Sequence, residues 1–418
     1  MKLILFPIFG SMMSHPISSI PFFTAVAFER AGYYGLRAIF VLFLVNSSIG
    51  LTNMEAIQFY AWGTGLVALS SVFGGLLGLI GQPKLLSIIG IGLQVLSSFL
   101  IGMSQTKELA FTGFALLALG AGIARSNIMP FLGQLYQRSR LLDSGMMINY
   151  MMVNIGAFAG IALISSVAIK QGYKMAFIYC GFAYLLSFIA LFFTNETKND
   201  PVHKPEKPNN LFPIILVVAL IGSAFYWLSF ERVIVHLTMA THNLDTGVLS
   251  ELIKSGGSNL NLIVIVATTL VLALYYSYSK ISTALQLGIG FLCALIAYLF
   301  LLPIDFYQPE SAPLVNLLLG FYILQSIAEV FIGPPISSYV VRKLDVKYSP
   351  IVLGGIYLLI ALILKAGANN DYGYVGRSLN IALVIMILFS AAFFVLFYIN
   401  KKSDPIDFEE DDFGADDF

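Results

Sequence analysis

Charged residues are scarce in this chain of 418 residues. Asp, Glu, Lys and Arg make up 11% of it and hydrophobic residues 58%, whereas about 25% of a soluble globular protein is charged. Apolar runs of roughly 18 residues or more recur along the whole length, which is the pattern of membrane-spanning helices. The composition therefore excludes an ordinary soluble protein and predicts a multi-pass protein in a lipid bilayer.

Cysteine and histidine are also rare, with two and four residues respectively. Cys180 and Cys293 both lie in apolar runs, so no disulfide framework is expected. The sequence has no Cys/His cluster with metal-ligand spacing, no GxxxxGK[ST] phosphate loop, no nucleophile–base constellation and no basic face suited to nucleic acid. We therefore expect no cofactor, no metal and no nucleic-acid partner, and neither an enzyme nor an ATP-driven pump. The N-terminus shows no convincing cleavage site, so we expect it to be retained.

The apolar pattern predicts an all-α membrane protein with twelve transmembrane helices. The predicted spans are 17–47, 55–80, 84–103, 108–137, 143–168, 173–194, 211–240, 259–278, 282–302, 313–341, 349–366 and 379–399. A charged segment with three prolines separates the sixth span from the seventh. The predicted organisation is a six-helix bundle (1–194), a cytoplasmic linker (195–210), a second six-helix bundle (211–402) and an acidic tail (403–418), which is the major facilitator architecture.

Lys and Arg residues favour one orientation of these spans. With a cytoplasmic N-terminus, thirteen of them lie in cytoplasmic segments and six on the opposite side, which agrees with the positive-inside rule. The formal net charge of zero conceals this bias, because residues 404–418 carry eight acids and no base and the rest of the chain is +8. We therefore predict a protein of the cell (inner) membrane with both termini in the cytoplasm and a solvated tail.

Seven charged residues lie well inside predicted spans, away from the span ends, where each costs at least about 2.5–3.5 kcal/mol on insertion scales. They are Glu29, Arg30, Arg37, Arg125, Glu231, Arg232 and Glu329. Static salt bridges that lock two bundles together would explain them. The alternative is a polar cavity on the central axis, and helical spacing favours it, because Arg30 and Arg37 share one face of the first span with two tyrosines.

The depth of these charges suggests how they meet. Arg37 and Glu231 lie at about the same depth in the first helix of each half, so we predict that they form a contact when the outer end of the molecule closes. Arg125 and Glu329 lie in the middle of the fourth and tenth spans. A basic site on one half would then face an acidic site on the other, which suits a zwitterionic solute. A short repeat, Phe-Glu-Arg at 28–30 and 230–232, weakly supports two related halves.

Aromatic and amide side chains within the spans have two interpretations each. Tyr33, Tyr34, Tyr150, Tyr226 and Trp227 could line a binding pocket or serve in packing. Asn154 and Asn261 could bind a peptide backbone or form hydrogen bonds between helices. Glycines at 120, 122, 156 and 160 are expected to permit close helix packing.

Motifs along the chain resemble those of the proton-dependent oligopeptide transporter family of the major facilitator superfamily. The motifs, in the family's order, are His15-Pro16, Phe22-Phe-Thr24, Glu29-Arg30-Ala-Gly-Tyr33-Tyr34-Gly35-Leu-Arg37, Gly120-Ala-Gly122-Ile-Ala-Arg125-Ser-Asn127, Asn149-Tyr150-Met-Met-Val-Asn154-Ile-Gly156-Ala-Phe158, Tyr226-Trp227-Leu-Ser-Phe-Glu231, Asn259-Leu-Asn261 and Ala328-Glu329-Val-Phe-Ile-Gly-Pro334. The resemblance covers most of the chain in register.

Several positions depart from the family pattern and mark a divergent member. Val26 replaces a glutamate, Arg125 replaces a lysine and is followed by Ser126 instead of proline, and Ile356 replaces a tryptophan. The loop motif at 74–84 has no Asp, and two additional helices found between the halves of many bacterial members are missing. These departures bear most on proton coupling.

The resemblance implies import of di- and tripeptides by proton symport with alternating access, by a protein that we expect to be a monomer. Arg37 and Arg125 would bind the peptide carboxylate with help from Tyr33, and Glu329 would hold the amino terminus. Glu29 and Arg30 would form a switchable charge cluster with Arg125, and Glu231 would carry the proton. A related carrier for nitrate, an amino acid or a drug, and a non-transporting sensor with the same fold, remain as alternatives.

Overall fold

The computed structural model describes residues 15–136, 139–194, 210–241, 258–304, 314–368 and 375–403. Within these ranges the chain forms helices and no strand. The helices are α2 (Ser19–Asn46), α3 (Asn53–Leu77), α4 (Pro83–Met103), α5 (Lys107–Leu135), α6 (Ser139–Gln171), α7 (Tyr173–Phe192), α8 (Phe212–Thr241), α10 (Ser258–Tyr278), α11 (Thr283–Leu299), α12 (Leu314–Lys343), α13 (Ser349–Ala368) and α14 (Val375–Ser403). Each predicted span corresponds to one of them, with ends that agree to within about one turn. Nine of the described helices are long and apolar enough to cross a membrane, and two shorter helices are also apolar.

Local signals in the sequence determine where several helices begin. The Thr52 hydroxyl accepts a hydrogen bond from the Glu55 amide at 3.3 Å, and the Glu55 carboxylate accepts one from the Thr52 amide at 2.9 Å. This capping box satisfies amide groups that the first turn of α3 leaves unpaired. The Thr106 and Ser282 side chains cap α5 and α11 by accepting a hydrogen bond from a backbone amide of the first turn. Pro83 occupies the first position of α4, where no amide donor is needed.

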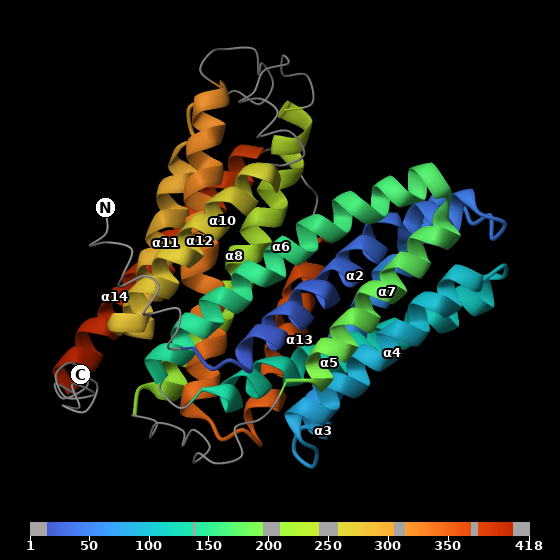
Figure 1. The fold of residues 1–418 in the computed structure, drawn as a ribbon. Coiled ribbons are helices and arrows are strands. Elements are labelled where there is room, and N and C mark those ends of the chain that lie inside the picture. Colours follow the sequence, from blue (N-terminus) through green and yellow to red (C-terminus); the bar gives the residue numbers. More distant parts are fainter. Residues whose placement is uncertain are drawn as a thin grey trace, which may run out of the picture.

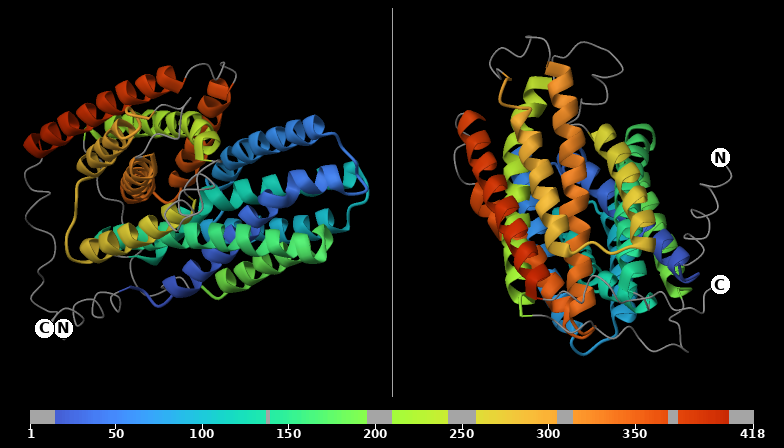
Figure 2. Two further views of the ribbon diagram at one scale, coloured as in Figure 1. Left: turned by 90° about the horizontal axis from the view of Figure 1, so that it is seen from above. Right: turned by 90° about the vertical axis from the view of Figure 1, so that its left-hand side faces the viewer.

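The first six helices form one bundle and the last six form the other (Figure 1). In the view from above, most helices of the first group lie on one side and most of the second group on the other (Figure 2, left). Within the first bundle α2 packs against α6 and α7, and α4 packs against α5; within the second, α11 packs against α12 and α14. The predicted linker and the acidic tail lie almost entirely outside the described residues.

Small residues bring the helices of the first bundle into backbone contact, as expected. An added Cβ at Gly156 or Gly160 of α6 would lie 2.2 or 2.1 Å from a backbone oxygen of α2. At Gly120 and Gly122 of α5, an added Cβ would come within 2.5 Å of backbone atoms of α4 and α3. The predicted role of these four glycines is therefore confirmed, because no larger residue fits without separating the helices.

The two bundles meet at one end of the molecule, which we call the closed end. There α2, α6 and α13 begin, and α3, α5, α10 and α12 end. A Cβ added to Gly354 of α13 would lie 2.3 Å from the backbone oxygen of Ser71 in α3. From this end the bundles diverge (Figure 1), and the described part of α8 has no extended contact with α2. We call the opposite end the open end.

Polar contacts reinforce the closed end. Asp143 of α6 pairs with Arg342 of α12 at 3.3 Å and accepts a hydrogen bond from Ser338. The neighbouring Ser144 donates to the backbone oxygen of Ala273 in α10 at 2.7 Å. His15 lies 3.2 Å from the Ser144 hydroxyl, and burial lowers the pKa of this histidine, so its neutral form fits the site.

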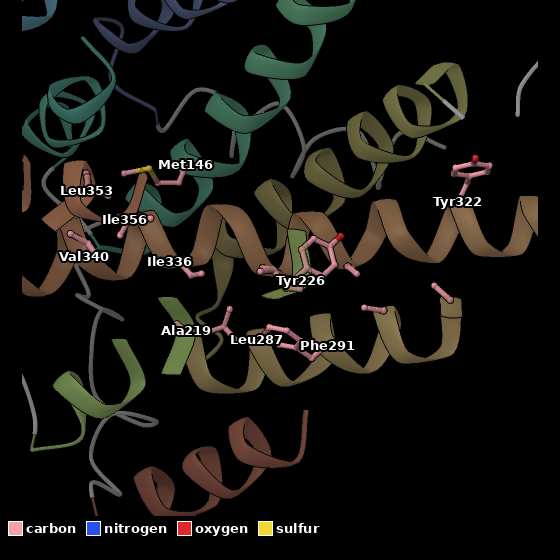
Figure 3. Packing of buried hydrophobic residues seen from close by; sticks show 14 of the residues in the cluster. Met146, Ala219, Tyr226, Leu287, Phe291, Tyr322, Ile336, Val340, Leu353 and Ile356 are labelled. Atoms are coloured by element: carbon pink, nitrogen blue, oxygen red, sulfur yellow. The ribbon is translucent and has the colours of Figure 1, made fainter. Parts of the chain in front are cut away.

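An apolar core extends from the second bundle across the closed end. Met146 of α6 lies beside Leu353 and Ile356 of α13, and Ile336 of α12 lies close by (Figure 3). Tyr226 and Phe291 continue the core into the second bundle. A separate core in the first bundle centres on aromatic residues of α2, α5 and α7. The molecule is therefore packed shut at one end and leaves a cavity above the shared core.

Candidate functional site

A cavity of about 360 Å³ lies between the two bundles. Helices α2, α5 and α6 line it from one side, with Ile91 of α4, and α8, α12 and α13 line it from the other. Nine of the predicted site residues line it: Glu29, Arg30, Tyr34, Arg37, Arg125, Tyr150, Asn154, Trp227 and Glu329. A volume of this size is at the small end of ordinary ligand pockets.

The cavity has an apolar floor toward the closed end. Met129 lies one turn beyond Arg125 along α5, and Ile336 lies about two turns beyond Glu329 along α12. Met146 and Leu353 complete this layer. The charged layer therefore lies above an apolar plug to which both bundles contribute.

Three arginines surround one tyrosine on the wall formed by the first bundle. The guanidinium carbons of Arg30, Arg37 and Arg125 lie 5.2, 5.4 and 5.2 Å from the centre of the Tyr33 ring. Tyr33 is only 3% exposed and lies behind the cavity wall. The ring face is negative, so it attracts these cations without neutralising them.

The three arginines differ in their other partners. Arg30 forms an ion pair with the adjacent Glu29. The Nε of Arg37 donates to the Tyr60 hydroxyl at 2.5 Å. Among the described residues, neither Arg37 nor Arg125 forms an ion pair with a carboxylate. Two positive charges therefore face the cavity in need of an anionic partner.

The acidic group lies on the second bundle. Glu329 accepts a hydrogen bond from the Tyr150 hydroxyl at 2.5 Å and one from the Asn261 amide at 3.2 Å. Both donors are neutral, and no described cation forms an ion pair with Glu329. Tyr150 belongs to α6, so this contact crosses from one bundle to the other. The carboxylate is thus oriented but not neutralised.

The two predicted asparagines are used in different ways. The Asn261 amide donates to both Glu329 and Ser326 at 3.2 and 3.0 Å, so it connects α10 to α12 and also orients the acid. The Asn154 amide donates at 2.9 Å to the Tyr150 carbonyl of its own helix while the residue lines the cavity. Asn261 therefore serves partly in a hydrogen bond between helices, whereas Asn154 lies where it can reach a ligand.

Glu231 is the predicted site residue that the structure leaves apart from the others. It is exposed and does not line the cavity. Arg37, its expected partner, is bonded to Tyr60 instead. The contact is expected in a molecule closed at its outer end, and the halves are apart at the open end of this structure. The Arg37–Glu231 contact therefore stays a prediction.

Several site residues were not anticipated from the sequence. Tyr357 of α13 lines the cavity, and its ring centre lies 5.2 Å from the guanidinium carbon of Arg125. Tyr60 of α3 holds Arg37. The only signal for Tyr357 was its neighbour Ile356, which occupies the family's tryptophan position and lines the cavity, as Val26 does.

Comparison with known proteins gives a family model and a group of relatives. The model for the Major Facilitator Superfamily matches residues 22–363. A dipeptide and tripeptide permease B from Salmonella typhimurium is 27% identical over 237 residues, 54% of this chain and 48% of that protein. A dipeptide and tripeptide permease A from Escherichia coli is 28% identical over 219 residues, 50% of this chain and 44% of that protein. The alignments thus span about half the length of these relatives.

Solved structures show the same fold over nearly the whole chain. The human organic anion transporter MFSD10 superposes with a TM-score of 0.66 at 14% identity, covering 92% of this chain and 99% of that one. A peptide transporter in complex with sulfate gives 0.59 at 17% identity, covering 90% and 94%. A transporter of the same peptide-transporter family in complex with 5-aminolevulinic acid also gives 0.59 at 17% identity, covering 91% and 97%. The predicted fold class, two six-helix bundles of a major facilitator protein, is confirmed.

Proposed function

Because this chain belongs to the Major Facilitator Superfamily, we propose that it is a secondary transporter that imports di- and tripeptides by proton symport. Its curated relatives are dipeptide and tripeptide permeases. Its ordered motifs resemble those of the proton-dependent oligopeptide transporters. The proposal makes the protein a carrier and not an enzyme, and it needs no cofactor.

One observation carries this proposal. Within the described part of the chain, the cavity sets two arginines that lack a carboxylate partner on one bundle against a glutamate that lacks a cation on the other. A peptide with free ends carries the complementary charges. Arg37 and Arg125 would bind its carboxylate beside Tyr33, and Glu329 would bind its amino group. The ligand would then bridge both bundles and favour their closure by its additional contacts in the closed state.

The length of the ligand follows from the same geometry. An extended chain spans about 3.5 Å per residue, and the cavity of about 360 Å³ is closed below by the apolar floor. Two or three residues suit a site with charges fixed at both ends. Tyr34, Tyr150, Asn154 and Trp227 would contact the rest of the peptide.

The proton would be carried by a carboxylate. Arginine does not deprotonate at working pH, so Arg30, Arg37 and Arg125 supply fixed charge. We propose that Glu231 carries the proton. Glu29 and Arg30 would form a switchable charge cluster with Arg125. Val26 provides no additional acid on the same face, so we propose that coupling is altered relative to the family and not lost.

We further propose that the protein lies in the inner membrane as a monomer, with both termini in the cytoplasm. The excess of Lys and Arg on that side supports this orientation. The closed end would then face the cytoplasm, and the cavity would open to the outside.

Purified protein in liposomes tests the function directly. Uptake of a labelled dipeptide should accelerate under an inward proton gradient and fall when unlabelled dipeptides compete. Arg125→Ala should reduce uptake at low peptide concentration. Gradient-independent uptake would remove proton symport from the proposal, and absence of any dipeptide uptake or exchange would leave the sensor alternative.

A carrier for another anionic or zwitterionic solute is the second candidate. Two arginines oppose one glutamate, so the charges without an ionic partner in the cavity sum to a net positive value. Nitrate, an amino acid or an anionic drug could satisfy them. Inhibition of uptake by such solutes, without inhibition by dipeptides, would favour this candidate.

A further inference from the structure

Two aromatic rings from opposite bundles lie within cation–π distance of Arg125. Its guanidinium carbon lies 5.2 Å from the ring centre of Tyr33 in α2 and 5.2 Å from that of Tyr357 in α13. Tyr33 is buried, whereas Tyr357 is half-buried and lines the cavity. The same arginine thus has one ring within its own bundle and one supplied by the other.

This arrangement suits a cation that must be held without being neutralised. A ring face attracts a guanidinium group but forms no ion pair with it, so the charge remains for a ligand. The guanidinium is planar and its N–H donors point outward in that plane. Two rings can therefore restrict its orientation and leave donors for a carboxylate.

The adjacent packing fixes Tyr357. Ile356 is buried in the core that crosses the closed end, and Leu353, one turn earlier, is 1% exposed. Gly354 contacts the backbone of α3. The position of the Tyr357 ring is thus tied to the packing of α13 against the first bundle.

We propose that Tyr357 is a positioning residue that holds Arg125 for the ligand carboxylate only while the closed end is closed. The inference rests on the proposed peptide function and adds a source of directionality to it. When the bundles separate at this end, α13 leaves α5, and Arg125 keeps the Tyr33 ring alone. The carboxylate is then held less tightly on the side where the peptide is released.

The test compares two substitutions at this position. Tyr357→Phe keeps the ring and Tyr357→Leu removes it. For each variant, competition against labelled dipeptide gives the ratio of affinities for a free dipeptide and its C-terminal amide. The ratio is measured within one protein, so it does not depend on the yield of folded variant. Tyr179→Leu, an exposed tyrosine of α7, is the matched control.

We expect Tyr357→Leu to reduce the free-to-amide ratio roughly two- to thirtyfold, and Tyr357→Phe and Tyr179→Leu to preserve it. In right-side-out vesicles the KM of Tyr357→Leu for the free dipeptide should rise by the same factor. In inside-out vesicles the KM of Tyr357→Leu should equal that of the unmodified protein, because the Tyr357–Arg125 contact is already broken in the inward-facing state.

An unchanged ratio in Tyr357→Leu, or an equal rise of KM on both sides, would overturn the inference while leaving peptide transport intact. If the unmodified protein neither binds nor transports dipeptides, the proposed function falls and the inference falls with it. If the free-to-amide affinity ratio also falls in Tyr357→Phe, the effect belongs to the hydroxyl, and the proposed role of the ring is overturned.

Discussion

At the scale of single residues, the cavity keeps charges in the membrane by surrounding them with groups that do not cancel them. Tyr33 faces three guanidinium groups, and Tyr150 and Asn261 donate to Glu329. The Glu29–Arg30 ion pair lies within α2, so it does not lock the two bundles together. Arg37, Arg125 and Glu329 lack ionic partners among the described residues, and this favours a ligand role.

Glu329→Gln should selectively weaken ligands that have a free amino group. The substitution keeps the shape and removes a charge-assisted contact of about 1.5–3 kcal/mol, so affinity for free dipeptides should fall roughly ten- to a hundredfold. Competition by N-acetylated dipeptides should change much less. Tyr150→Phe removes only a donor to the carboxylate and should give a smaller effect. Equal losses for free and acetylated peptides would assign Glu329 to another role.

At the residue level, charge inside apolar spans was the signal that pointed to the cavity, although Glu231, chosen on the same signal, does not line it. Charges inside apolar spans are costly, so the sequence alone sufficed to place Arg37, Arg125 and Glu329 in a cavity. The aromatic partners Tyr60 and Tyr357 could not be found in this way. A tyrosine in a membrane helix can face lipid, protein or cavity, and the rotation of the helix that decides this depends on its neighbours.

At the scale of elements, helix contacts in the first bundle depend on glycines, because a residue without a side chain lets two backbones touch. Apolar helices gain little by leaving lipid for each other, so close packing must supply the association. Gly156 and Gly160 let α6 lie on the backbone of α2, the helix that carries Glu29, Arg30 and Arg37. The positions of Arg30 and Arg37 thus depend on these two glycines.

Gly160→Ala should destabilise the fold. Its Cβ would lie 2.1 Å from the backbone oxygen of Ala31, which is on a helix and cannot move alone. Overpacking of this kind costs about 1–3 kcal/mol. Thermal unfolding followed by a thiol-reactive dye would report it, because Cys180 is fully buried in the native state.

Gly65→Ala in α3 is the control, since nothing lies within 4 Å of the added Cβ. Its unfolding temperature should equal or exceed that of the unmodified protein, because Ala favours the helix over Gly. If both variants unfold at the temperature of the unmodified protein, the contact between α2 and α6 tolerates the methyl group and the packing argument is wrong.

Element prediction succeeded because hydropathy reports span length directly. All twelve helices of the described ranges were predicted, with ends within about a turn. Hydropathy does not report how helices pair, and the closed end illustrates this limit. Asp143 was placed at the edge of a span and Arg342 among the positive loop residues, so their buried contact between α6 and α12 could not be predicted.

At the scale of the whole molecule, the structure has the form that one of the two end states of the proposed alternating access would take. The bundles are fastened at the closed end and apart at the other (Figure 1). Transport requires the polar contacts at the closed end to break in each cycle. The Asp143–Arg342 pair and the bond from Ser144 to Ala273 are the contacts that must separate there.

Asp143→Asn should shift the molecule toward the state that is open at this end. Removing one partner of a buried ion pair costs about 3–5 kcal/mol, and here the loss falls only on the state in which the pair forms. Spin labels at Ile80→Cys and Tyr348→Cys, in a background without Cys180 and Cys293, would sit on opposite bundles near this end; both native residues are exposed. The label distance should lengthen in the variant. A distance distribution identical to that of the unmodified protein would show that the pair does not hold the end shut.

Closure of the open end is expected to bring Arg37 and Glu231 together. Arg37 is bonded to Tyr60, and Glu231 is exposed on the facing bundle. When the open end closes, α2 and α8 approach each other. Arg37 should then break its hydrogen bond to Tyr60 and form an ion pair with Glu231. Glu231→Gln should then abolish gradient-driven uptake but allow exchange of peptide across a membrane without a gradient, because exchange needs no net proton movement. Reversing the charges with Arg37→Glu and Glu231→Arg should restore part of the closure, although not the carboxylate site. A structure closed at the outer end with the two charged groups more than about 6 Å apart, beyond the reach of one bridging water, would exclude this contact from the cycle.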